Sequence, residues 1–222
     1  MTELTDLGFS EGVIVETVVS TYNVDGQPNA APMGAIMTGL QRIVLKIYTS
    51  SLTYKNLQSK RCAVVNVTSD AEVFYRTAFK EGNLNGRQPL EWFEKAETVD
   101  APRFRAAEAY VEVAVGDIAP IDAERAEVFC DVKRIEASAT LPKAYCRALF
   151  ATIEAVTHAT RVKTFIAHAD RQKREQALKL IETIRQCDDV VNRVAPHSCF
   201  SEIMKDLNKR VESWRAKSES LR

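Results

Sequence analysis

The chain has 222 residues, 45% of them hydrophobic and 27% charged, and its 30 basic side chains match 30 acidic ones. This composition predicts a globular protein with a core of its own and excludes a disordered chain. The balanced charge gives no general attraction to nucleic acid, and no run reaches the roughly 18 apolar residues of a membrane span. Residues 1–10 are acidic and lack the basic and apolar parts of a secretion signal, so we expect a cytoplasmic protein.

The N-terminal part of the sequence carries strand patterns separated by turn signals. β-branched and apolar residues dominate the runs 13–19, 30–37, 42–48 and 62–68. Between the first two runs, the Asp25-Gly26 pair is typical of a tight hairpin. Residues 50–58 form a polar turn that we expect to enter a short helix. These patterns predict strands that follow one another through short connections.

The middle of the chain is irregular before the strand pattern returns. Residues 74–102 mix aromatic pairs with glycine and proline, which predicts a loop with short helices. Its aromatic side chains either cover a bound ring or fill a small core of the loop. Alternating apolar and polar residues at 109–118 and 126–135 then predict two more strands. Six antiparallel strands are typical of a small barrel.

The last third of the sequence is predicted to be helical. Pro142 suits the first turn of a helix in which Tyr145, Leu149, Ile153 and Val156 share one face. Helical spacing of apolar residues recurs at 172–186 and, most regularly, at 200–214. We therefore expect an α+β protein with a β-barrel at 1–141 and a helical region at 142–222, packed on the barrel or in a dimer interface.

Two segments of the barrel combine residue types that suit a small ligand. Small residues and prolines in 28–34 leave room for a flat ring against the backbone. Hydroxyl and amide groups in 50–56, at an expected helix start, suit a phosphate, with Lys55 as a countercharge. Each signal alone is weak, because such clusters also form ordinary turns and helix caps.

The order of these motifs is more specific than any one of them. The runs VETVVSTYNVDGQPNAAPMGAIM, RIVLKIYTSSLTYKNL and CAVVNVTSD resemble the FMN-binding split-barrel superfamily of flavin reductases and pyridoxamine-phosphate-oxidase-like proteins. Within it, the chain is most similar to the domain of unknown function 447 family. The resemblance implies an antiparallel split β-barrel and a homodimer that binds FMN between its two protomers. It also implies a small-molecule electron donor or acceptor.

The resemblance also assigns candidate cofactor-binding residues. Residues near the isoalloxazine ring would be Asn29, Ala30, Ala31, Pro32, Met33 and Gly34. Residues near the ribityl phosphate would be Ser50, Ser51, Thr53 and Asn56, with Asn66 as a further contact. No residue shows the pattern of a catalytic acid, base or nucleophile. An FMN oxidoreductase of unknown substrate is therefore the first hypothesis, a non-catalytic flavin-binding or interaction module is the second, and a flavin-free barrel is the third.

Other motifs do not support a different chemistry. The sequence around Ser10 matches GxSxG, but a nucleophile elbow needs a preceding strand and a following helix, whereas here a polar terminus precedes an expected strand. The three histidines and five cysteines lack the spacing of a metal site. Neither a Rossmann fingerprint nor a Walker loop occurs. We expect reduced thiols, no bound metal and no partner among nucleic acids.

Overall fold

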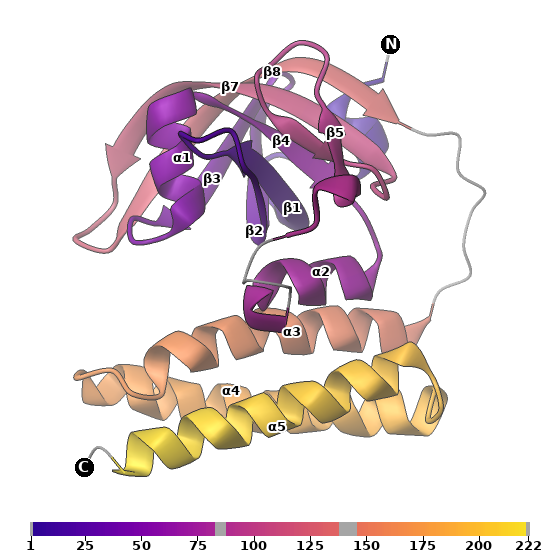
Figure 1. Cartoon of the computed structure of the whole chain (residues 1–222), viewed down its shortest axis with the longest axis vertical. Coiled ribbons are helices and arrows are strands. Elements are labelled where there is room, and N and C mark those ends of the chain that lie inside the picture. Colours follow the sequence, from indigo (N-terminus) through magenta and orange to yellow (C-terminus); the bar gives the residue numbers. More distant parts are fainter. Residues whose placement is uncertain (1, 83–87, 138–145, 221–222) are drawn as a thin grey trace. The chain divides into compact units, whose positions relative to one another are not determined.

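The computed structural model describes residues 2–82, 88–137 and 146–220. The chain divides into two compact units, one formed by residues 1–69 and 79–141 and the other by residues 70–78 and 142–222. The first unit is a β-barrel and the second is a group of helices (Figure 1). Within the described residues, no helix has the length and apolarity needed to cross a membrane.

The first unit is built on a closed antiparallel barrel of six strands, which confirms the predicted fold class. Around the barrel the order is β1-β2-β3-β8-β7-β4. The strands are β1 (Ile14–Tyr22), β2 (Pro28–Gly39), β3 (Arg42–Tyr48), β4 (Cys62–Val67), β7 (Ala109–Pro120) and β8 (Arg125–Ala137). The first four lie where β-branched and apolar runs predicted strands, and β7 and β8 lie where alternating apolar and polar residues did.

The predicted hairpin joins β1 to β2 through the loop 23–27. Gly26 takes a φ of 75°, a left-handed conformation that glycine adopts without steric cost. Asn23 fixes the loop through its side-chain Oδ1, which accepts hydrogen bonds from the backbone N–H of Asp25 at 3.0 Å and of Gln27 at 2.8 Å. The loop thus begins with a side chain that replaces a backbone acceptor.

Alternate residues of the strands fill the inside of the barrel. Val19, Leu45, Val65 and Val111 are fully buried there, and Leu57 joins them from the helix α1 (Leu52–Lys60). Thr17, Val19 and Thr21 therefore share the inner face of β1, because side chains of a strand point to the same face at every second position. The inner face of β1 thus carries the buried hydroxyl groups of Thr17 and Thr21 on either side of Val19.

The irregular segment after β4 contains more order than the sequence indicated. It holds α2 (Ala71–Ala78), the 3₁₀ helices η2 (Lys80–Gly82) and η4 (Leu90–Trp92), and a two-stranded sheet of β5 (Phe93–Lys95) and β6 (Pro102–Phe104). The prediction of a loop with short helices was wrong for this sheet, since strands of three residues are too short to show alternation. Phe93 and Phe104 pack edge to face at 5.4 Å, so these rings fill a small core.

A buried carboxylate holds the connection between β5 and β6 against the barrel. Glu112 of β7 is 1% exposed and accepts hydrogen bonds from the backbone N–H of Glu97 at 2.9 Å and of Thr98 at 2.6 Å, and from the Thr98 hydroxyl. Burial raises the pKa of Glu112, but hydrogen bonds from Thr98 and Glu97 outweigh it, and the pKa lies below its ordinary value. The charged form is therefore favoured in the folded protein.

Replacing Glu112 by glutamine is expected to lower the free energy of unfolding at pH 7 by about 1 to 3 kcal/mol, because the amide cannot accept every bond. In the wild type this contribution is present above the ordinary pKa of 4.5 and is lost as pH falls through the lower folded pKa. Urea unfolding between pH 7 and pH 3 measures both effects. Glu127→Gln on β8, which removes a surface ion pair with Lys46, is the matched control. Equal losses in the two variants would contradict this role for Glu112.

The second unit consists of α2 with the helices α3 (Arg147–Phe165), α4 (Arg171–Val194) and α5 (Cys199–Ser220). The long helices run alongside one another (Figure 1). Apolar stripes predicted at 172–186 and 200–214 are buried at Ile181, Ile184, Met204 and Leu207. Helix α4 extends beyond its predicted end to Val194, and the predicted positions Pro142 and Tyr145 lie outside the described residues.

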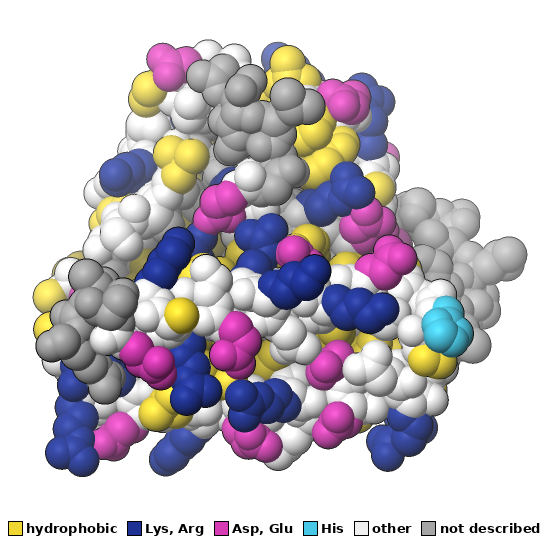
Figure 2. All heavy atoms as spheres, turned by 60° about the horizontal axis from the view of Figure 1, so that its bottom comes forward, with side chains coloured by type: hydrophobic (Ala, Val, Ile, Leu, Met, Phe, Trp, Pro, Cys, Tyr) yellow, Lys and Arg dark blue, Asp and Glu magenta, His cyan; other side chains and the backbone are white. Residues whose placement is uncertain are grey.

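Charged residues of both signs alternate on the outer surface of α4 and α5. Arg171 pairs with Glu175 at 2.8 Å, and Arg215 pairs with Glu219 at 3.1 Å, both one helical turn apart. Figure 2 shows Lys and Arg side chains interspersed with Asp and Glu over the face in view. Such alternation leaves no extended field of one sign on the face shown.

A candidate ligand pocket between β2 and the start of α1

Three of the predicted cofactor-binding residues meet in one buried hydrogen-bond network. Asn29 of β2 donates from Nδ2 to Thr53 Oγ1 at 3.1 Å and to Thr21 Oγ1 at 3.4 Å. Asn56 donates to the same Thr21 hydroxyl at 2.9 Å. Thr53 and Asn56 share a face of α1 because they are three residues apart. Thr21, directly opposite Asn29 on β1, was missed by sequence reasoning, although its register in the hairpin could have indicated it.

Part of β2 has an edge that β3 does not cover. The pairing of β2 with β3 covers β2 only from Ala35 onward, whereas β1 pairs with β2 from Ile36 back to Pro28. The N–H of Ala30 donates to Gln88 Oε1 at 2.6 Å, so it is not bonded to β1. Hydrogen-bonding direction alternates along a strand, so the carbonyl of Pro32, which has no N–H, and the N–H of Gly34 face this same open edge. The backbone groups of Ala31 and Met33 face β1.

Gln88 covers one position of this open edge. Its side-chain Nε2 donates to the carbonyl oxygen of Ala30 at 3.0 Å while its Oε1 accepts from the Ala30 N–H. Gln88 is buried and was not identified from the sequence. Ala30 can therefore bind a group that offers one donor and one acceptor side by side. In this structure an amide side chain supplies that pair.

The predicted phosphate segment forms the start of α1. Ser51 is the N-cap, and its Oγ accepts a hydrogen bond from the Tyr54 N–H at 3.1 Å. Ser51 therefore serves as a helix cap, the ordinary role of serine at this position. Ser50 precedes it and is exposed. The N–H groups of Leu52 and Thr53 have no acceptor within the helix, as in any first turn.

Asn66 lies apart from these residues, on the outer side of the barrel wall. It is fully buried, and its Nδ2 donates to Val18 O at 2.7 Å, Ser20 Oγ at 2.8 Å and Val64 O at 3.1 Å. Its Oδ1 accepts from the Phe104 N–H at 2.7 Å. Both ends of the amide are thus used in joining β1, β4 and β6. In this structure Asn66 therefore links strands, and it does not line the pocket.

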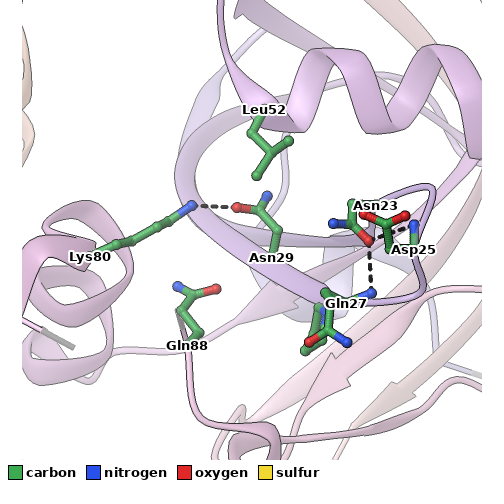
Figure 3. Close-up of a pocket in the computed structure, with 8 residues that line it drawn as sticks. Asn23, Asp25, Gln27, Asn29, Leu52, Lys80 and Gln88 are labelled. Atoms are coloured by element: carbon green, nitrogen blue, oxygen red, sulfur yellow. Dashed lines mark hydrogen bonds between the residues drawn. The ribbon is translucent and has the colours of Figure 1, made fainter. Parts of the chain in front are cut away.

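A cavity of about 440 Å³ lies between the two predicted segments. This volume is within the range of roughly 300 to 1,000 Å³ found for small-molecule sites. Its lining residues are Asn23, Asp25, Gln27, Pro28, Asn29, Leu52, Lys80 and Gln88. Figure 3 shows Asn29 near the middle of this set, with Lys80 on one side of it and the hairpin residues Asn23, Asp25 and Gln27 on the other. Asn29 comes from the first predicted segment and Leu52 from the second.

Lys80 brings a positive charge to this pocket. Its Nζ donates to Asn29 Oδ1, the oxygen of the amide that also bonds to Thr53 (Figure 3). Burial lowers the pKa of Lys80 to about 8, although the neighbouring Glu81 opposes the shift. Sequence reasoning missed Lys80, because it lies in the irregular segment with no pattern around it.

The described residues offer no alternative metal chemistry. Among them no group of three or more His, Cys, Asp or Glu side chains could hold a metal ion. The cysteines Cys62, Cys130, Cys146, Cys187 and Cys199 are all free thiols. Ser10 of the GxSxG motif follows the 3₁₀ helix η1 (Leu4–Leu7), not a strand, and precedes β1. That order does not form a nucleophile elbow.

Comparison with known proteins identifies relatives of the barrel unit. A family model described as the N-terminal domain of a protein of unknown function, DUF447, matches residues 15–149. The FMN-bound DUF447 protein of Methanosarcina mazei is similar to this chain, with a TM-score of 0.74 and 23% identity, covering 94% of this chain and 99% of that one. This likeness shows a shared fold.

Two further solved structures are similar over part of the chain. The 2-nitrobenzoate 2-nitroreductase of Pseudomonas fluorescens has a TM-score of 0.47 and 21% identity, covering 58% of this chain and 67% of that one. Component B of nitrilotriacetate monooxygenase from Bacillus cereus has a TM-score of 0.49 and 16% identity, covering 60% and 75%.

Proposed function

The chain belongs to the DUF447 family, and we propose that it is a flavoprotein that binds FMN in the pocket between β2 and α1. The pocket carries this proposal, because it is bordered by both segments that the sequence marked, Asn29 from one and Leu52 from the other. The FMN-bound relative from Methanosarcina mazei supports the choice of ligand.

The groups present fit the two ends of FMN. The uncovered edge of β2 offers the carbonyl of Pro32 and the N–H of Gly34 to the hydrogen-bonding edge of a flavin ring, and Ala30 offers one donor and one acceptor where the ring takes the place of Gln88. The amide of Gln88 already presents to Ala30 one donor and one acceptor, the same pair that the imide of a flavin offers. At the other end, hydroxyls of Ser50 and Ser51 and the first N–H groups of α1 suit a phosphate. We leave Asn66 out of the ligand set.

We further propose that the protein is a cytoplasmic homodimer, with FMN between its protomers, that acts as an oxidoreductase. FMN when bound supplies hydride transfer at its N5 atom. The chain's own residues would bind and orient the cofactor and limit the access of water. No side chain is assigned as a catalytic residue. The exchange partner would be a small molecule that donates or accepts electrons.

Titration of the purified protein with FMN tests the binding proposal directly. The expected result is a saturable quenching of FMN fluorescence at micromolar protein, with one FMN per chain. Riboflavin, which lacks the phosphate, serves as the comparison ligand in the same titration. Protein that leaves the fluorescence of both ligands unchanged would contradict the proposal and favour a flavin-free barrel.

A non-catalytic flavin-binding module is the second candidate. Among the described residues that line the pocket, the ionisable ones are Lys80 and Asp25, and they lie on opposite sides of Asn29 (Figure 3). They do not form a paired acid and base. Anaerobic mixing of the FMN-loaded protein with NADH, NADPH or a reduced deazaflavin separates the two candidates. A catalyst should lose its flavin absorbance with one donor and recover it with an acceptor, whereas a binding module should respond to none.

A further inference from the structure

Lys80 is a partly buried cation with a neutral partner. Among the described residues, the hydrogen-bond acceptor of its Nζ is the amide oxygen of Asn29, and no carboxylate of that set lies within 4 Å of it. Among these residues the ammonium therefore has no ion-pair partner, although the charge of the neighbouring Glu81 acts on it. An ammonium removed from water without an anion destabilises the folded protein, which is why buried lysines are usually paired.

Removal of the ammonium from water also lowers the pKa of Lys80. Burial shifts the pKa from 10.5 to about 8, and the charge of Glu81, its neighbour in the chain, opposes this shift. At pH 7 the side chain still carries its proton. Asp25 also lines the pocket, but it belongs to the hairpin loop on the other side of Asn29 (Figure 3). The pocket thus has a positive end and a negative end.

The positive end lies beside the start of α1. Lys80 contacts Asn29, Asn29 donates to Thr53, and Thr53 is the second residue of α1. Leu52, the first residue of the helix, lines the same pocket as Lys80. An anion in the pocket can therefore meet the ammonium and the N-terminal turn of α1 together. Lys55, which the sequence suggested as a countercharge, is exposed and is not one of the residues that line the pocket.

We propose that Lys80 pairs with the terminal phosphate of bound FMN and is the residue that makes this chain prefer FMN to riboflavin. This inference rests on the proposed function. A phosphate monoester carries nearly two negative charges at pH 7, and its oxygens accept charge-assisted hydrogen bonds. Pairing replaces a neutral acceptor by an anion and so offsets the cost of keeping the ammonium out of water.

The test compares FMN with riboflavin in the full-length protein, by fluorescence quenching at pH 7, for the wild type and for Lys80→Met and Lys80→Arg. Lys80→Met is expected to weaken FMN about 10- to 100-fold, the effect of losing one charge-assisted bond, and to leave riboflavin unchanged. Lys80→Arg should stay within a few-fold of the wild type. Lys95→Met, which removes an exposed lysine of β5 outside the pocket, is the matched control and should change neither ligand.

Protonation of Lys80 gives a second readout. Because the free protein releases this proton near pH 8, FMN affinity of the wild type should fall about tenfold between pH 7 and pH 9. Lys80→Arg should show no such fall, since arginine stays charged. Riboflavin has the same ring and controls for changes elsewhere in the site.

The outcomes separate this inference from the proposal of FMN binding. Wild-type protein that binds neither ligand overturns the proposed function. Wild-type protein that binds FMN, with Lys80→Met unchanged, overturns only the assignment of Lys80. Equal weakening of FMN and riboflavin by Lys80→Met also overturns it, because that pattern indicates a structural role through Asn29.

Discussion

Asn66→Asp is expected to lower the free energy of unfolding at pH 7 by about 3 to 5 kcal/mol, although the two side chains have the same shape. Asn66 is fully buried, and its Nδ2 donates to three oxygen atoms. In the variant a carboxylate oxygen would face those oxygens, with no hydrogen to offer them. Denaturation by urea, followed by circular dichroism, measures the loss.

Asn23→Asp is the matched control for this substitution. Asn23 uses its Oδ1 to accept two backbone N–H groups in the exposed hairpin loop, and a carboxylate can accept both. Its stability should stay within about 0.5 kcal/mol of the wild type. Comparing the two variants separates the loss of the Asn66 donor from the general effect of adding a negative charge.

The pH dependence of the Asn66→Asp variant gives a further check. Burial among oxygen atoms raises the pKa of the introduced carboxyl in the folded state above its value in the unfolded chain. The folded variant therefore binds a proton more tightly than the unfolded chain does. The difference between its free energy of unfolding and that of the wild type should shrink as pH falls. A variant as stable as the wild type, with weaker FMN binding, would show instead that Asn66 contacts the ligand.

The strands of the barrel were predictable because their signals are local. The run 42–48 was expected as a strand and forms β3 with the same limits, Arg42–Tyr48. Its β-branched and apolar residues specify both the strand and its buried face. By contrast, β5 and β6 have three residues each and are stabilised by the contact of Phe93 with Phe104 and by the Glu112 carboxylate. Those partners come from separate parts of the chain.

The residues of the candidate site also differ in whether a local motif identifies them. Asn29, Thr53 and Asn56 belong to short motifs of one hairpin and the following helix, and the structure brings them together. Lys80 and Gln88 reach the same pocket from an aperiodic segment that follows α1 and β4 in the chain. Nothing in their neighbours reveals this, because it depends on tertiary folding. Asn66 illustrates the reverse case, since an amide that binds a ligand and one that joins strands look alike in a sequence.

Gly34→Trp is expected to weaken FMN binding about 100-fold or more, equivalent to ~2.7 kcal/mol. Gly34 lies on the part of β2 whose edge β3 leaves uncovered, where the other residues of the same face are Pro28, Ala30 and Pro32. A large ring at this position would take the space that a flat ligand needs along the strand. Fluorescence titration with FMN and with riboflavin should show the same loss, because the ring is common to both ligands.

The structure also shows how this substitution must be controlled. A Cβ atom at position 34 would lie 2.8 Å from Cγ2 of Ile14, a side chain of β1 that is 59% exposed. Gly34→Trp alone would therefore disturb β1 as well as the ligand. Combining it with Ile14→Ala removes that contact, and Ile14→Ala alone provides the reference for FMN affinity and for thermal unfolding.

The two ligand-binding predictions together locate the cofactor. Bulk at Gly34 should affect FMN and riboflavin equally, whereas loss of charge at Lys80 should affect FMN alone. The double variant Ile14→Ala/Gly34→Trp, if folded with the stability of its reference and still able to bind FMN normally, would show that the ring does not lie along β2. A Lys80 effect that persisted in that case would still place the phosphate in the pocket, with the ring directed towards Asp25 and the hairpin loop.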